Sequence, residues 1–492
     1  MIIKQNSDEI QNYLSDASNY SGSCEAVYFP ENENDVAALL KKSSDEKKRI
    51  TISGNGTGLT GARVPEGGIV LSVEKMNRII EVNESEKYAI VEPGVLLKDF
   101  QDEVESRNLF YPPDPTERNC FIGATVATNS SGARTFKYGP TRDYVLSLRI
   151  VLSDGEIIKI SRDQFRSDGY DAMLLTESGK ILSFNLPKYE MPETKNAAGY
   201  YCKENMDLID IFIGSEGTLG VITQIKLKLI ELPMSVFSSV AFFRSEDDAL
   251  NFIEHARSIS RENRLIANKK LSARGLEFFD KNGIDFLRDA YTKIPDSAEA
   301  AVWFEQETGN EKDSPESQWI EILDRYNCIT DESWLALGSS DEETFKEFRH
   351  AIAWKVNEYI TQKGLKKVGT DTAVPEQYFK EFYRLSKKMV EENGLKYVIY
   401  GHAGNCHLHL NMLPENPFQF QIAKKVYSDL CALAVSFKGT VSAEHGIGKA
   451  KREYLIKMYG EDVVRKMALL KLAFDPIKIL SIGNIFEERF LD

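Results

Sequence analysis

Residues Ile50–Pro65, ITISGNGTGLTGARVP, begin as a β-prone run and then enter a loop with four glycines in eight positions, Gly54, Gly56, Gly58 and Gly61. Glycine has no Cβ, so its backbone N–H groups can approach an anion closely and the chain can adopt positive φ. The spacing is not the G-x-G-x-x-G of a dinucleotide fold, and no Gly-Lys-Ser/Thr follows, which excludes a Walker loop. The loop is either a cradle for a phosphate-bearing cofactor or a plain glycine-rich turn.

The size and composition of the chain limit what it can be. Its 492 residues exceed what one core usually holds, so two or three domains are expected. A net charge of −14 argues against a nucleic-acid binder, which needs Lys and Arg to neutralise phosphates. No stretch approaches the length of a transmembrane helix and the N-terminus lacks the apolar core of a signal peptide, so we expect a cytoplasmic protein.

The six cysteines are scattered and form no C-x-x-C motif. This pattern excludes an iron–sulfur centre and a zinc knuckle. Any electrons must therefore leave through a partner or a diffusible acceptor.

Composition changes along the chain predict three parts. Residues 1–233 alternate strands and helices, including a helix in ENENDVAALLKKSSDEKK, a long loop-rich block at 107–155 and two β-rich segments around IFIGSEGTLGVIT. Residues 234–398 mix charged helices with strands such as VFSSVAFF and AAVWFEQE, as an α+β cap domain would. Residues 399–492 begin with a histidine-rich stretch and continue as helices around 421–437 and 451–472.

Four of the six histidines fall in one 44-residue window, His402 to His445. In YVIYGHAGNCHLHLNML the side chains of His407, His409 and Asn411 would share one face of a strand. SAEHGIG adds the adjacent pair Glu444 and His445. Imidazoles with a carboxylate suit Zn²⁺ or a similar divalent ion, whereas isolated histidines are mostly surface or hydrogen-bonded core groups. Composition leaves open whether His407 or His409 is the ligand.

Upstream, FRHAIAWKVNEYI is helix-like and carries Arg349 near its start. A guanidinium can hold a substrate carboxylate through two parallel hydrogen bonds. The alternative is a solvated residue on a helix surface.

Together these blocks resemble the FAD-dependent D-2-hydroxyacid dehydrogenases of the vanillyl-alcohol oxidase superfamily, which include D-lactate dehydrogenases, D-2-hydroxyglutarate dehydrogenase and the glycolate oxidase D-type subunit. SGNGTGLTGARVP is similar to the family's GGGTGLSGGAVP, and PPDPTERNCFIGATVATNSSGARTFKYGPTRDYV and IGSEGTLGVIT are close to its other flavin-contacting segments. The resemblance implies an α+β fold: a two-subdomain, PCMH-type FAD-binding domain at 1–233, an α+β cap (substrate) domain at 234–398 and a mainly helical C-terminal segment at 399–492.

By resemblance, FAD is held by Ser53, Gly54, Asn55, Gly56, Thr57, Gly58, Gly61, Pro113, Asp114, Gly123, Ala124, Thr128, Asn129, Gly132, Tyr138, Gly217, Gly220, Val221 and Ile222. Some members of the superfamily attach FAD to a histidine of this domain. No histidine precedes His255 here, so we expect non-covalent FAD.

The family motifs GHxGDGNLHLN and SAEHGxG imply that His402, His409 and Glu444 bind a divalent metal, Zn²⁺ or Mn²⁺, and that His445 is the catalytic base. FRHAIAWK resembles the family's substrate-binding helix and favours Arg349 as the carboxylate clamp, with Asn411 also at the substrate. GTDTAVP is similar to the family's STDVCVP turn. The chain departs from the family by carrying His407 in place of an asparagine, Cys406 and Asn405 in place of glycine and aspartate, and LSIGNIF in place of LNPGKIF.

The activity implied is oxidation of a D-2-hydroxy acid of the D-lactate, glycolate or D-2-hydroxyglutarate class to the 2-oxo acid, with hydride passing to the flavin. The alternatives are a flavin oxidase of another alcohol that uses O₂, and a flavin subunit of a multiprotein electron-transfer complex. Expected partners are the small acid, an acceptor such as a quinone, cytochrome or flavoprotein, which would bring the protein to a membrane periphery, and a second copy or the subunits of a complex.

Overall fold

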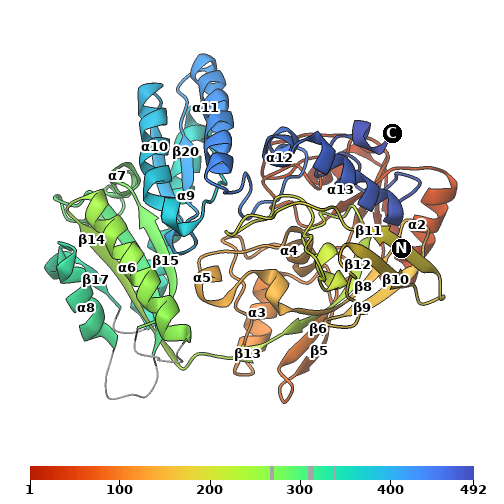
Figure 1. The fold of residues 1–492 in the computed structure, drawn as a ribbon, viewed down its shortest axis with the longest axis horizontal. Coiled ribbons are helices and arrows are strands. Elements are labelled where there is room, and N and C mark those ends of the chain that lie inside the picture. Colours follow the sequence, from red (N-terminus) through yellow and green to blue (C-terminus); the bar gives the residue numbers. More distant parts are fainter. Residues whose placement is uncertain (266–270, 309–314, 337–338) are drawn as a thin grey trace.

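The computed structural model describes residues 1–265, 271–308, 315–336 and 339–492. It is a mixed helix and sheet protein, as predicted, and its chain is arranged in two lobes (Figure 1). The larger lobe holds the N-terminal half of the chain, and the smaller lobe is built on a second large sheet.

The first sheet of the larger lobe has the order β1-β2-β4-β3. Its strands are β1 (Ile2–Lys4), β2 (Ala26–Phe29), β4 (Ile69–Ser72) and β3 (Ile50–Ser53). The predicted helix on this sheet is α2 (Glu33–Asp45), which buries Val36, Leu39 and Leu40. The Asn32 side chain caps α2 by accepting from the Asp35 N–H at 3.0 Å. Because β3 ends at Ser53, the glycine loop begins at the edge of a buried sheet.

The second sheet of this lobe is antiparallel, in the order β5-β6-β12-β8-β9. Its strands are β5 (Ile79–Asn83), β6 (Tyr88–Val91), β12 (Val221–Lys228), β8 (Val145–Val151) and β9 (Ile157–Ser161). The helices of this region are α1 (Ser7–Ile10), α3 (Leu97–Glu105), α4 (Ile122–Thr128) and α5 (Thr135–Tyr138). Two small antiparallel pairs complete it: the hairpin of β10 (Asp171–Leu175) and β11 (Ile181–Asn185), and the distant strands β7 (Leu109–Phe110) and β13 (Ile230–Glu231).

One of the two segments predicted as β-rich is not a strand. Residues Leu208–Ile211 form a short 3₁₀ turn, while β12 follows as expected. All residues of the turn are buried. A short, fully buried apolar run has no periodicity that separates a strand from a turn or helix.

The sheet of the smaller lobe has seven strands in the order β17-β14-β16-β15-β19-β20-β18. They are β17 (Trp334–Leu335), β14 (Ser235–Phe243), β16 (Ala300–Thr308), β15 (Ala273–Phe279), β19 (Tyr397–Gly401), β20 (His409–Met412) and β18 (Val368–Gly369). The helices that accompany it are α6 (Glu246–Leu265), α7 (Lys281–Leu287), α8 (Pro315–Arg325), α9 (Ser339–Gln362), α10 (Phe379–Glu392) and α11 (Pro417–Ser436).

Helices cover both faces of this sheet. Phe252 of α6 packs against Phe304, whereas Phe348 of α9 packs against Phe279 at 5.4 Å. Trp303 and Phe304 are neighbours on β16 and point to opposite faces, so Trp303 faces the α9 side. The positions that surround Arg349 are thereby set by the strand alternation of β15 and β16.

The C-terminal part of the chain links the two lobes. Strands β19 and β20 lie in the sheet of the smaller lobe, while α12 (Arg452–Tyr459) and α13 (Glu461–Phe474) lie on the larger lobe (Figure 1). The helix predicted over 451–472 is thus two helices, which break at Gly460 with φ +79°. The predicted domain limits near residues 233 and 398 stay predictions. Among the described residues, no helix has the length and apolar character needed to cross a membrane.

Candidate active site

The predicted metal ligands come together where β19, β20 and the loop after α11 meet. His402 follows β19, His409 begins β20, and Glu444 lies in the loop. One ligand atom from each of these residues and one from His407 all lie within 4.8 Å of one another. The extra imidazole predicted at position 407 is therefore part of the same cluster, which we call the donor set: His402, His407, His409 and Glu444.

The Glu444 carboxylate is the centre of the donor set. Its Oε1 lies 3.3 Å from His409 Nε2 and 3.4 Å from His445 Nε2. Its Oε2 lies 3.4 Å from His402 Nε2. Burial acts to raise the pKa of Glu444, but Lys195 and His402 outweigh it and hold that pKa well below the usual value.

Glu277, on β15, orients His402 and was missed by the sequence analysis. Its Oε1 lies 2.7 Å from His402 Nδ1. Burial raises the pKa of Glu277, yet His402 and Arg349 lower it to about 2, so the carboxylate is ionised and can only accept. His402 Nδ1 must then donate, which leaves Nε2 as the ring atom that faces the donor set, as in carboxylate–histidine–metal arrangements.

Asp371, in the GTDTAVP turn, is a second site residue that the sequence pattern alone does not reveal. It is 1% exposed, and its Oδ2 lies 3.3 Å from His445 Nδ1 and 2.6 Å from Lys451 Nζ. It also accepts from the backbone N–H of Glu444 at 3.2 Å and of His445 at 3.0 Å. Burial raises the pKa of Asp371, but His445, Lys451 and His407 together hold it well below its usual value. Asp371 therefore fixes both the backbone and the ring of His445.

Lys195 is the third missed residue, and it comes from the larger lobe. It lies in the KNAAGYY stretch, and its Nζ contacts Glu444 Oε2 and lies 3.3 Å from His407 Nδ1. An ammonium has no lone pair, so His407 Nδ1 must be the acceptor of this contact.

The other ring nitrogen of His407, Nε2, faces Asp371. It lies 3.1 Å from Asp371 Oδ1, an ion-pair distance without the angle of a well-aligned hydrogen bond. Burial and Lys195 lower the pKa of His407 to about 3, and burial also lowers the pKa of His409 despite Glu444. Metal ligation needs neutral imidazoles and an ionised carboxylate, and His407, His409 and Glu444 offer them. Burial acts to lower the pKa of His402, but Glu277 and Glu444 outweigh burial and Lys195 and raise that pKa, so a bound metal would displace a proton from His402. The residues present thus fit a divalent ion such as Zn²⁺ or Mn²⁺.

Arg349 lies beside the donor set and is not a solvated surface residue. It is 7% exposed, and its guanidinium lies over the Trp303 ring at 5.3 Å. Its Nε is 3.4 Å from Glu277 Oε2, and its Nη1 is 3.9 Å from Asp114 Oδ2. Asn411 is buried on β20, where its Nδ2 donates to the His409 carbonyl at 3.3 Å.

The glycine loop has the features of an anion cradle. Within the described chain, the N–H groups of residues 55–60 have no hydrogen-bond acceptor, whereas Gly61 N–H donates to Asp16 Oδ2 at 2.9 Å. Gly56 and Gly61 have φ of +80° and +74°, which only glycine adopts easily. A Cβ added at Gly58 would meet nothing nearer than 3.8 Å, so open space faces that residue.

The other residues predicted to hold FAD lie on segments that pack around this loop. A Cβ added at Gly54 would lie 3.0 Å from Ala124 of α4, and one at Gly217 would lie 3.0 Å from Ile52. Glu216 N–H donates to the Ala127 carbonyl at 2.8 Å, which joins the GSEG segment to α4. The remaining predicted residues lie on the same segments: Ser53 on β3, Asn55 and Thr57 in the loop, Pro113, Asp114, Gly123, Thr128, Asn129, Gly132 and Tyr138 between β7 and η2 (Thr141–Tyr144), and Gly220, Val221 and Ile222 at the start of β12.

The C-terminal segment closes this region from the other side. Asn484, in LSIGNIF, donates through Nδ2 to the carbonyls of Ala62 at 2.9 Å and Glu216 at 3.0 Å. The Glu216 carboxylate accepts from Ile447 N–H and Gly448 N–H at 2.7 Å each. The turn that follows His445 is therefore tied to the segment beside the glycine loop.

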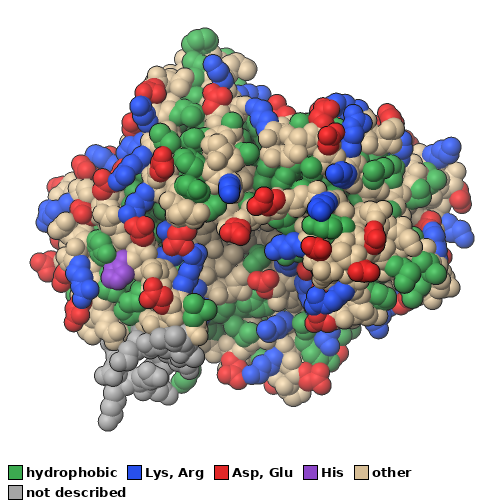
Figure 2. All heavy atoms as spheres, viewed as in Figure 1, with side chains coloured by type: hydrophobic (Ala, Val, Ile, Leu, Met, Phe, Trp, Pro, Cys, Tyr) green, Lys and Arg blue, Asp and Glu red, His purple; other side chains and the backbone are tan. Residues whose placement is uncertain are grey.

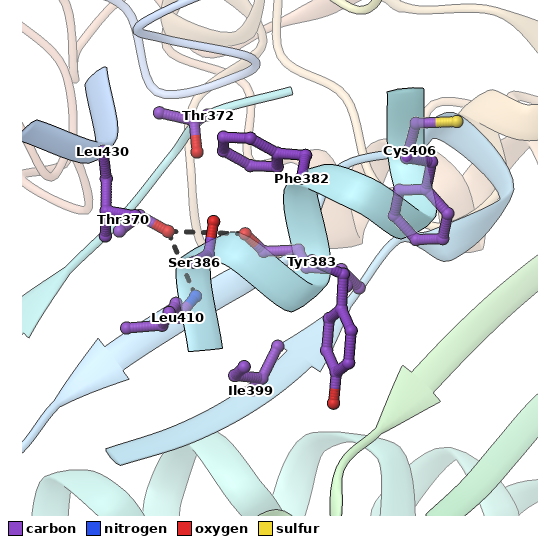
Figure 3. A pocket seen from close by; sticks show the side chains of 11 residues that line it. Thr370, Thr372, Phe382, Tyr383, Ser386, Ile399, Cys406, Leu410 and Leu430 are labelled. Atoms are coloured by element: carbon purple, nitrogen blue, oxygen red, sulfur yellow. Dashed lines mark hydrogen bonds between the residues drawn. The ribbon is translucent and has the colours of Figure 1, made fainter. Parts of the chain in front are cut away.

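The surface has a hollow between the lobes (Figure 2), and a small cavity lies inside the smaller lobe. The face drawn in Figure 2 is hollowed between the two lobes, and Lys and Arg are interspersed there with Asp and Glu. The pocket in Figure 3 lies under α10, lined mainly by apolar side chains such as Phe382, Ile399 and Leu410. Its volume of about 20 Å³ is room for little more than a water molecule, so it is not the substrate site.

Comparisons with known proteins identify the family of the chain. Residues 24–161 match the FAD binding domain family, and residues 240–485 match the C-terminal domain of FAD linked oxidases. The glycolate oxidase subunit GlcD of Bacillus subtilis is 30% identical over 95% of this chain and 90% of its own. A D-lactate dehydrogenase of Anaerostipes hadrus is 31% identical over 92% of this chain and 87% of its own.

Solved structures share the fold at lower identity. The 4-ethylphenol oxidase from Gulosibacter chungangensis superimposes with a TM-score of 0.68 at 16% identity, over 99% of this chain and 95% of its own. An alkyldihydroxyacetonephosphate synthase gives a TM-score of 0.66 at 16% identity, over 97% and 81%. With the family matches covering most of both lobes, the chain belongs to the FAD-linked oxidases, a family of flavin enzymes.

Proposed function

We propose that this protein oxidises a D-2-hydroxy acid to the 2-oxo acid with FAD as the immediate acceptor. The observation that carries the proposal is the convergence of a carboxylate-oriented histidine, His445, with the donor set and the buried Arg349. Relatives named D-lactate dehydrogenase, D-2-hydroxyglutarate dehydrogenase and glycolate oxidase subunit support the substrate class.

The glycine loop and the segments packed around it would hold FAD without a covalent bond to histidine. The unpaired N–H groups of residues 55–60 suit the pyrophosphate, and Gly58 leaves room for it. When bound, FAD supplies a two-electron acceptor for the hydrogen at C2 of the substrate.

His402, His407, His409 and Glu444 are the residues that would hold a divalent metal. When bound, the metal supplies Lewis acidity, which lowers the pKa of a coordinated hydroxyl. Glu277 orients His402 so that Nε2 is the ring atom that faces the donor set.

His445 would take the proton of the substrate hydroxyl. Asp371 lies 3.3 Å from its Nδ1, which favours the tautomer with the proton on Nδ1 and leaves Nε2 to act as base. Nε2 lies 3.4 Å from Glu444 Oε1, so the base faces the donor set. Arg349 would hold the substrate carboxylate, and Asn411 on β20 would contribute a polar contact.

Two alternative functions of the same flavin site predict different behaviour of the purified protein. An oxidase that uses O₂ would form hydrogen peroxide in step with substrate. A subunit of a multiprotein electron-transfer complex would stay inactive until a partner is added; the relative GlcD is named as a subunit. The acceptor, whether a quinone, a cytochrome or another flavoprotein, would be supplied from outside the chain.

The test is anaerobic bleaching of the flavin absorbance by D-lactate, glycolate, D-2-hydroxyglutarate and longer D-2-hydroxy acids. We expect one of them to bleach the flavin, its L enantiomer not to, and a chelator to slow the reaction. The variant His445→Ala should stay yellow and folded but fail to bleach. Bleaching by none of the acids, or full turnover by His445→Ala, would refute the proposal.

A further inference from the structure

A buried ammonium occupies part of the space that a metal would need. Lys195 Nζ contacts Glu444 Oε2 and lies 3.3 Å from His407 Nδ1, both atoms of the donor set. The Lys195 side chain is 5% exposed and that of Glu444 is 10% exposed. The contact is therefore shielded from water, and its two charges are screened little by salt.

The backbone on both sides of Lys195 is anchored to the C-terminal part of the chain. Thr194 Oγ1 donates to the Val374 carbonyl at 3.3 Å, and Ala197 N–H donates to the Ser442 carbonyl at 2.8 Å. Asn196 Oδ1 accepts from Thr440 Oγ1 at 2.6 Å. A segment of the larger lobe is thus fixed so that one lysine points into the cluster carried by the other lobe.

The charges around the cluster explain why a cation rests there. Glu444 presents Oε2 and His407 presents Nδ1 to Lys195 Nζ, and both atoms can accept from an ammonium, which has donors only. The ammonium satisfies Glu444 and His407 in the same way that a metal ion would. A divalent ion and an ammonium a few ångströms apart in a buried site would repel each other strongly.

We propose that Lys195 is a built-in cation of the donor set, and that a divalent ion binds there only when the Lys195 side chain leaves Glu444. This inference rests on the metal site of the proposed function. It makes Lys195 a positioning residue: it keeps the four donors assembled when no metal is bound, and it lowers the affinity for metal by competing for the same atoms.

The direct test is a metal titration of the full chain, loaded with flavin and stripped of metal. Binding of Co²⁺ is measured by the visible absorption of the bound ion. Binding of Zn²⁺ is measured by competition with a chromophoric chelator. Lys195→Met keeps the length of the side chain and removes the charge. We expect it to bind both ions at least about tenfold more tightly than the wild type. Lys195→Arg, which keeps the charge, should bind no more tightly than the wild type.

The matched control is Lys188→Met, which removes an exposed lysine of the same segment and should leave the affinity unchanged. A second readout is thermal unfolding. Without metal, Lys195→Met should unfold at a lower temperature than the wild type, because the Glu444 carboxylate loses its partner, and added Zn²⁺ should raise its unfolding temperature more than that of the wild type.

The outcomes are separable from those of the proposed function. Equal or weaker metal affinity in Lys195→Met, or no binding of either ion by any variant, would overturn the inference even if the wild type bleaches with a hydroxy acid. If Lys195→Met does not fold, Lys195→Gln is measured in the same way and the same affinities decide. Tighter binding in an enzyme that no hydroxy acid bleaches would support the inference and count against the substrate proposal alone.

Discussion

Asp371 Oδ2 lies 3.3 Å from His445 Nδ1, and the same oxygen accepts the His445 backbone N–H at 3.0 Å. One carboxylate therefore sets both the position of the residue and the tautomer of its ring. The Nε2 atom on the other side of the ring is left facing Glu444 at 3.4 Å. The chemistry proposed for His445 depends on this pair.

The variant Asp371→Asn should lower kcat by about two to four orders of magnitude while FAD stays bound. An amide can donate to Nδ1, which favours the wrong tautomer and puts the proton on Nε2. The measurement is steady-state reduction of a dye by the best hydroxy acid, together with the flavin content of the purified protein. Lys451→Met removes another partner of the same carboxylate, 2.6 Å away, without touching His445, and should cost much less. Comparable losses in both variants would mean that the carboxylate acts through the local fold only.

Gly58 provides a test of the FAD cradle that is separate from folding. A Cβ at this position meets nothing nearer than 3.8 Å within the protein, so Gly58→Val should not disturb the apoprotein. It would fill the space that faces the unpaired N–H groups of residues 55–60 and should lower FAD retention at least about tenfold. The readout is flavin absorbance per protein after gel filtration, with the circular dichroism spectrum as a check on folding. The neighbouring exposed residue gives the control Leu59→Ala, and full retention of FAD by Gly58→Val would place the pyrophosphate elsewhere.

Arg349 should act on substrate binding more than on the chemical step. Arg349→Lys keeps a positive charge near Glu277 and Asp114 but loses the planar fork, and we expect KM to rise about tenfold to a hundredfold with a smaller change in kcat. Arg349→Met should raise KM further than Arg349→Lys, because Glu277 and Asp114 then lose a buried counter-charge. The measurement is kcat and KM for the acid that bleaches the flavin. An unchanged KM in Arg349→Lys would show that Arg349 serves only to hold these carboxylates.

The part of the site that could be predicted from sequence is the part that is local in sequence. His402, His409, Glu444 and His445 stand out because strands and turns of one short window carry them, and His407 stands out as one more imidazole in that window. The glycine loop can be recognised for the same reason, because its glycines are close together in the sequence and glycine, which lacks a Cβ, leaves its backbone N–H accessible.

Glu277, Asp371 and Lys195 could not be identified as members of the site, because their partners lie on other elements. Glu277 reaches His402 only because β15 pairs with β19. Lys195 reaches Glu444 only because a segment of the larger lobe docks on the C-terminal turn. The local sequence around a carboxylate or a lysine in a polar stretch does not show whether the side chain is solvated or buried. Tertiary packing decides its role. For Asp371 the sequence carries one signal: this residue lies in GTDTAVP, which resembles the family's STDVCVP turn.

Asp280 gives a prediction about pH and stability away from the donor set. It caps α7, and its Oδ1 accepts from Gly283 N–H at 2.7 Å and Ile399 N–H at 3.0 Å, while its Oδ2 has no partner among the described residues. Burial raises the pKa of Asp280 to about 7, although these hydrogen bonds act to lower it. The folded protein therefore prefers the protonated carboxyl, and the unfolded chain, with a pKa near 3.8, does not.

Because the folded pKa lies above the unfolded one, the stability that this group contributes is full below about pH 4 and is lost as pH rises through about 7. The variant Asp280→Asn would keep both backbone contacts through its amide oxygen, and its side chain cannot ionise. Relative to the wild type, Asp280→Asn should thus gain about 3 kcal/mol of stability as the pH rises from 5 to 8, because each of the two pH units up to the folded pKa contributes about 1.4 kcal/mol. The measurement is the unfolding temperature of both proteins across this range, with Asp285→Asn on the same helix as a control whose difference from the wild type stays flat, since the pKa of Asp285 is lowered. A constant difference between Asp280→Asn and the wild type from pH 5 to pH 8 would show that Asp280 is ionised in the folded state throughout, held so by the two N–H groups it accepts from.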